Sequence, residues 1–152
     1  MVADTKTNKL SAQLDLRMWV RLLECAKMIE KQLRRNFLEQ FDTTLPRFDV
    51  LATLERAPEG LNMGSLSRAL LVSNGNVTSI VRQLQEQGLV SSRPDPADGR
   101  SAIVALTSRG REQFAALAAA HHGWVHEALD SFSEDKQEAL LSLLTELKTQ
   151  LR

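Results

Sequence analysis

The feature that most constrains the fold is a short β-forming stretch in a chain otherwise patterned for helices. Residues 95–107 read DPADGRSAIVALT, so an Asp-Gly pair leads into a run of small and β-branched residues. Asp-Gly is a strong signal for a tight turn between two strands. The flanking segments LVSSRP and SAIVAL are therefore predicted to form a two-stranded hairpin with Arg100 at its tip.

Two short helices are predicted immediately before this hairpin. The segment NMGSLSRALLVS has a helical apolar spacing and begins with an asparagine suited to capping. The segment SNGNVTSIVRQLQEQG follows, with Ser73 as its candidate cap and Gly88 as its candidate end; its inward face would be Val77, Val81 and Leu84. Two helices joined by a short turn form a helix-turn-helix, and a hairpin directly after it makes a winged helix.

Longer amphipathic helices flank this unit on both sides. Residues 13–41 place apolar side chains three and four positions apart, and Thr44 with Pro46 suits the start of a second helix. Thr107 and Ser133 are candidate caps for two further helices. The expected fold is thus mostly α with a small β-hairpin wing, in one domain covering residues 1–152.

Composition excludes several classes of protein. The single cysteine, Cys25, excludes an internal disulfide and a cysteine-based zinc cluster. No apolar stretch reaches the roughly 18 residues that a membrane span needs, and the first ten residues lack the apolar core of a secretory signal. We therefore expect a cytoplasmic protein without membrane contact. The sequence has no nucleophile elbow, phosphate loop or zinc-protease motif, so neither an enzyme nor a bound cofactor is predicted.

Charge and polarity point to nucleic acid at the centre of the chain. The net charge is zero, yet residues 61–111 hold six arginines against three acidic residues. The face of the second short helix opposite its apolar side carries Asn74, Asn76, Thr78, Ser79, Arg82 and Gln83. Amide, hydroxyl and guanidinium groups can pair with base edges in the major groove. A face that only kept the helix soluble would more typically carry pairs of Glu and Lys.

The remaining basic residues suggest how such a unit would sit on DNA. Arg100, on a narrow projection, can enter a minor groove, where negative potential is concentrated. Alternatively, Arg100 pairs with the neighbouring Asp98 and stiffens the turn, and both roles can hold together. Arg68 and Arg93 are predicted to contact phosphates.

At this point the chain resembles the MarR (multiple antibiotic resistance regulator) family of bacterial transcription factors. Its residues match the family's wing pattern Asp-x-Arg-x-x-x-Val-x-Leu-Thr-x-x-Gly at Asp98, Arg100, Val104, Leu106, Thr107 and Gly110. The resemblance implies a winged-helix DNA-binding lobe over residues 45–110 and a helical dimerisation lobe over residues 10–42 and 111–152. It also implies a homodimer on a pseudo-palindromic operator. Independently, the apolar surface of the terminal helices exceeds what one small core could cover, and such surface marks association sites.

The resemblance further implies a repressor that releases DNA when a small molecule binds, often a phenolic or aromatic acid. The pocket would lie where the two lobes meet, and Trp19, Arg47 and Phe48 are candidates for its lining. In the alternative interpretation, the aromatic side chains of Trp19 and Phe48 belong to the core.

Other modes of regulation remain open from the sequence. His122 and His126 lie four residues apart on one helical face, a spacing that can bind zinc, but no further ligand can be placed beside them. Cys25 could sense oxidants, although the peroxide-sensing branch of the family pairs its cysteine with tyrosines and this chain has none. A winged-helix adaptor that binds proteins is the third possibility.

Overall fold

The computed structural model describes residues 3–71 and 76–152, with side chains from residue 13 onward. Over these residues the chain forms six helices and three short strands. In chain order they are α1 (Ala3–Phe41), α2 (Leu45–Glu55), β1 (Leu61–Asn62), α3 (Met63–Ala69), α4 (Val77–Glu86), β2 (Val90–Pro94), β3 (Ala102–Leu106), α5 (Ser108–Leu129) and α6 (Glu134–Gln150). The order confirms a winged helix between long flanking helices, although α1 begins ten residues before the predicted start.

The predicted hairpin is confirmed, and it carries a third strand that the sequence did not reveal. Strands β2 and β3 pair antiparallel from Val90 opposite Leu106 to Pro94 opposite Ala102. On the other edge of β3, the two residues of β1 pair with Val104 and Ile103. A strand of two residues is too short to show an alternating pattern, so it became visible only through its partner.

Polar caps start the helices as predicted, with one exception. The side chains of Thr44, Thr107 and Ser133 each accept a hydrogen bond from the first turn of the helix that follows. The exception is α4, whose cap is Asn76 and not the predicted Ser73, which lies outside the described residues; Asn76 Oδ1 accepts the backbone N–H of Ser79 at 3.0 Å. Helix α4 therefore begins only at Val77.

The core lies between α2, the end of α1 and the middle of α5, and it is rich in aromatic rings. Phe37 from α1 is fully buried, with its ring 4.8 Å from Phe48 and 4.9 Å from Trp124. The ring of Phe48 also stacks on Phe114 at 5.7 Å and on His121 at 4.6 Å. These contacts fix α2 between the two long helices, and α2 in turn supports the short helices of the winged unit.

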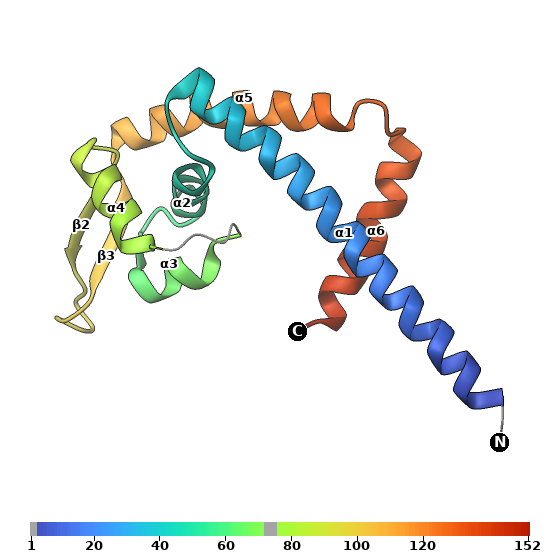
Figure 1. Cartoon of the computed structure of the whole chain (residues 1–152). Helices are drawn as coiled ribbons and strands as arrows, with labels where there is room; N and C mark the ends of the chain where they lie inside the picture. Colours follow the sequence, from blue (N-terminus) through green and yellow to red (C-terminus); the bar gives the residue numbers. More distant parts are fainter. Residues whose placement is uncertain (1–2, 72–75) are drawn as a thin grey trace.

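Away from this core, the terminal helices extend into solvent. Figure 1 shows α1 running from the winged unit toward the N-terminus, with α6 crossing it near its middle, where Met18, Leu22 and Cys25 border a groove with α6. No residue of α6 is buried in the single chain. Over the described residues, none of the helices is long and apolar enough to cross a membrane.

Candidate nucleic-acid interface

Helix α4 turns its apolar side chains inward and its polar ones toward solvent. Val81 and Leu84 are buried against α2 and the sheet. Four predicted base-reading residues fall within the described chain, and they are exposed or half-buried: Asn76, Thr78, Ser79 and Arg82. Asn74 lies outside the described residues. The polar face of this helix is thus available to a partner.

The cap at the start of α4 limits what Asn76 can do. Its amide oxygen holds the N–H of Ser79, so the amide group retains its two N–H donors for other contacts. Bidentate pairing with adenine also needs the oxygen, whose second lone pair would have to accept from the base while the first still holds the Ser79 N–H. Asn76 can therefore donate to a base or phosphate acceptor while it keeps the helix start in place.

The hairpin tip is ordered by its aspartates and leaves Arg100 exposed. Asp98 Oδ1 accepts the backbone N–H of Arg100 at 3.1 Å, and Asp95 Oδ1 accepts that of Ala97 at 2.9 Å. Within the described part of the chain, the Arg100 guanidinium has no hydrogen bond or ion pair. Asp98 therefore stiffens the turn through the backbone, and the arginine side chain stays available.

Two further arginines, Arg68 and Arg93, lie near α4 and the hairpin, and each side chain makes one hydrogen bond. Arg68 Nη2 donates to Ser65 Oγ at 3.3 Å within α3, and Arg93 Nη2 donates to the Glu59 carbonyl at 3.0 Å. Both side chains are exposed. Figure 1 shows α3, α4 and the hairpin together at the end of the molecule opposite α6. The predicted DNA-contacting residues thus belong to one end of the fold.

A buried aspartate that the sequence analysis missed holds the backbone that follows α3. Asp49 of α2 is 5% exposed, and its Oδ2 accepts the backbone N–H of Leu71 at 2.8 Å. This bond anchors the end of α3 to α2. The signal available in the sequence was an acidic residue between Phe48 and Val50, both apolar, on a helix face that must be buried.

The three predicted effector-lining residues are not brought together within one chain. Phe48 belongs to the aromatic core, and Arg47 donates from Nε and Nη2 to Gln83 Oε1 at 3.0 and 2.6 Å. Trp19 is 54% exposed on the distant part of α1. At about 1.5 Å per residue, it lies about 27 Å from Phe37 along that helix.

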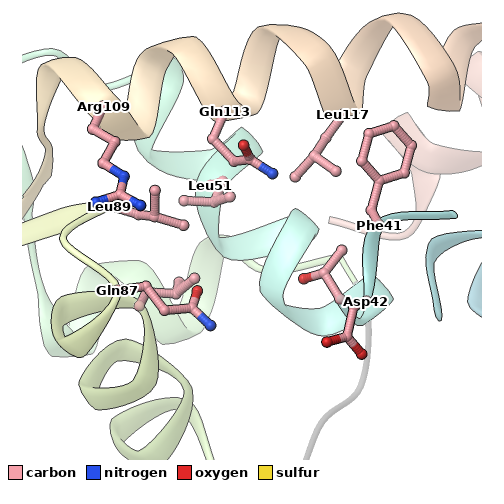
Figure 2. Close-up of a pocket in the computed structure, with 10 residues that line it drawn as sticks. Phe41, Asp42, Leu51, Gln87, Leu89, Arg109, Gln113 and Leu117 are labelled. Atoms are coloured by element: carbon pink, nitrogen blue, oxygen red, sulfur yellow. The ribbon is translucent and has the colours of Figure 1, made fainter.

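A different cavity lies where the winged unit meets the long helices. It measures about 290 Å³, and its lining comes from the end of α1, α2, the end of α4 and the start of α5. Figure 2 shows Arg109, Gln113 and Leu117 extending from α5 into the cavity, with Gln87, the residue that ends α4, below them and with Leu51 and Leu89 between. Arg109 and Gln113 are one helical turn apart, which is the signal that could have suggested a shared polar edge.

The histidines and the cysteine occupy different surroundings. Burial lowers the pKa of His121, the neighbouring His122 lowers it further, and its ring stacks on Phe48. His122 and His126 are exposed, and so is Cys25. Among the described residues, no three His, Cys, Asp or Glu side chains gather closely enough to hold a metal ion.

Comparisons with known proteins agree on one family. Residues 41–101 match the model of the MarR family. The chain is 34% identical over 73% of its length to the transcriptional activatory protein BadR of Rhodopseudomonas palustris, of which the match spans 65%. It is 37% identical over 76% of its length to the uncharacterised helix-turn-helix regulator YkoM of Bacillus subtilis, covering 73% of that protein.

Solved structures extend the similarity over most of the fold. A MarR family regulator from Silicibacter pomeroyi superposes with a TM-score of 0.81 at 30% identity, covering 93% of this chain and 98% of that one. Sco3205 of Streptomyces coelicolor, solved in complex with DNA, superposes with a TM-score of 0.76 at 22% identity, covering 90% of this chain and 87% of that one.

Proposed function

The chain belongs to the MarR family of transcriptional regulators, and from this premise we propose that it binds double-stranded DNA sequence-specifically as a homodimer. The observation that carries the proposal is the exposed polar start of α4 at the same end of the molecule as Arg100, whose exposed guanidinium has no partner among the described residues. In this proposal Asn76, Thr78, Ser79 and Arg82 read base edges in the major groove. Arg100 enters the minor groove, and Arg68 and Arg93 bind phosphates.

The homodimer is supported by apolar surface that the single chain leaves uncovered. Helix α6 has no buried residue, although it carries Leu140, Leu141 and Leu143. Together with α1 it borders a groove of about 600 Å³ lined by leucines, Met18 and Cys25. A helix this exposed gains little from its own chain, so a second copy must bury it. Two winged units would then reach half-sites roughly 34 Å apart.

For regulation, we propose a repressor that releases DNA when a small organic acid, such as an aromatic carboxylate, occupies the 290 Å³ junction cavity. Arg109 supplies a cation for a carboxylate, Gln87 and Gln113 supply amide groups, and the leucines supply an apolar floor. The cavity touches α4 and α5 together, so an occupant would alter how the recognition helix sits.

One experiment tests the DNA-binding proposal. Wild-type protein should enrich a pseudo-palindromic sequence from a randomised duplex pool, and its affinity should fall steeply with salt because phosphate contacts release counterions. Sedimentation should give a dimer both alone and on the duplex. If no sequence is enriched and binding to protein partners is insensitive to salt, the winged-helix adaptor is the better reading.

A second experiment tests the effector and the direction of regulation. A panel of aromatic acids is titrated against the complex of wild-type protein and the enriched duplex, with Arg109→Met and Arg111→Met compared. Only Arg109→Met should blunt release, since Arg111 does not line the cavity. A reporter gene downstream of the duplex should be repressed without the acid; activation would refute the repressor assignment.

A further inference from the structure

Helix α4 has an internal polar anchor in addition to its apolar packing. Nε and Nη2 of Arg47, on α2, both donate to Oε1 of Gln83, at 3.0 and 2.6 Å. Within the described residues, these are the only side-chain hydrogen bonds that join α4 to α2. Both side chains are half-buried, and bonds from a cation are about twice as strong as neutral ones.

The α2 end of this anchor is rigid. Arg47 lies in the first turn of α2, where its backbone N–H donates to the Thr44 cap at 3.3 Å. The next residue, Phe48, is fixed in the aromatic core between Phe37, Phe114 and His121. The guanidinium therefore extends from a backbone that cannot readily shift.

On α4, the contact with Arg47 restricts how the Gln83 side chain can bind DNA. Because its oxygen is occupied by Arg47, the Gln83 amide cannot make the paired oxygen-and-nitrogen contact that recognises adenine. Its neighbour Arg82 and, one turn earlier, Ser79 remain available on the surface. The contact thus sets the rotation of α4 and leaves base reading to those neighbours.

We propose that Arg47 is a positioning residue for DNA recognition, which acts by fixing the rotation of α4 through Gln83 and without touching DNA. Side-chain ends lie about 5–6 Å from a helix axis, so a rotation of about 10° moves them by about 1 Å. Recognition groups must be held to about 0.5 Å. The inference rests on the proposed DNA-binding function.

The test compares Arg47→Met, Gln83→Met and the double variant on two probes. One probe is the duplex that wild-type protein enriches from a randomised pool, and the other is a scrambled duplex of the same length. Each single variant should weaken the first complex about tenfold and leave the second unchanged. The double variant should also bind the enriched duplex about tenfold more weakly than wild type, and no weaker, because the two substitutions remove the same contact.

Controls separate positioning from folding and from phosphate binding. The ratio of the affinities for the enriched and the scrambled duplex does not depend on the fraction of protein that is folded. Arg47→Lys keeps one donor group, so its ratio should lie between those of wild type and Arg47→Met. Arg56→Met removes a positive charge from the opposite end of α2. This variant should keep the wild-type affinity for both duplexes, since Arg56 is exposed and caps the C-terminal end of that helix. The salt dependence of Arg47→Met should match wild type.

Three results would overturn the inference. They are an unchanged affinity ratio in Arg47→Met, a double variant that loses the product of the two single losses, and a salt slope lowered by about one in Arg47→Met, which would indicate a phosphate contact. If instead the wild-type protein enriches no sequence at all, the proposed function itself fails.

Discussion

Gly110 offers the sharpest stability test of the way the wing is attached. It lies in the first turn of α5, and a Cβ built there would come within 1.9 Å of the Leu89 carbonyl oxygen and 2.9 Å of the Leu89 carbonyl carbon. Leu89 cannot move freely, because its oxygen accepts the N–H of Thr107 at 3.1 Å and its N–H donates to Leu84 at 2.9 Å. Leu89 also joins α4 to β2, so this close approach sets the wing against the recognition helix.

The magnitude for Gly110→Ala follows from two opposing terms. Relieving an overlap of more than an ångström against fixed backbone costs about 3 kcal/mol of folding free energy. The higher intrinsic helix propensity of alanine relative to glycine stabilises the folded state by about 1 kcal/mol. The net loss of about 2 kcal/mol should lower the melting temperature by about 4–8 °C in a chain of this size.

Gly123→Ala is the matched control, because it makes the same change in the same helix. A Cβ at Gly123 meets no described residue within 4 Å, so the variant should gain up to about 1 kcal/mol and melt about 2–4 °C higher. Melting is followed by circular dichroism at one fixed protomer concentration, since a dimer's transition depends on concentration. The reasoning is refuted if Gly110→Ala melts with, or above, the wild type.

Three further predictions concern the wing, the recognition helix and pH. Arg100→Ala should weaken binding to the enriched duplex strongly in a band-shift assay and leave the melting curve unchanged; unchanged affinity would remove the wing from the mechanism. Arg82→Ala should weaken the free energy of DNA binding by about 1–3 kcal/mol and relax the preference at one base position. Selection from the randomised duplex pool, repeated with the variant, measures that preference, and an unchanged preference would contradict the prediction. Since burial lowers the pKa of His121, folding stability should fall as pH drops below 6.5, where the unfolded histidine gains its proton first. His121→Phe should reduce this loss in denaturant titrations, and an identical pH profile would contradict it.

Local signals were enough to predict the order of the elements. The Asp-Gly turn predicted the hairpin, and the polar residues Thr44, Thr107 and Ser133 marked helix starts, because both kinds of signal depend on a few neighbouring residues. The cap of α4 was misplaced because SNGN offers several capping residues in a row.

Contacts between distant residues were the part that the sequence could not supply. Phe48 was a candidate for lining a pocket, yet its place between Phe37, Phe114 and His121 results from three helices meeting. Arg47 was a candidate for the same pocket from its position in the chain, but its guanidinium donates to Gln83, 36 residues away. Periodicity identifies which face of a helix is buried, but it does not identify the side chain that will meet that face.

These long-range contacts together suggest why one family can couple a distant event to DNA. Helix α2 holds the recognition unit at two points, through Asp49 to the end of α3 and through Arg47 to the middle of α4. Helix α5 holds it at a third, where Gly110 approaches Leu89. Because α5 continues from this contact to the connection with α6, any change in the packing of the long helices must reach α4 through α2 or α5. The junction cavity is lined by residues from α2, from α5 and from the end of α4, so a ligand bound there as proposed would displace α4 without unfolding it.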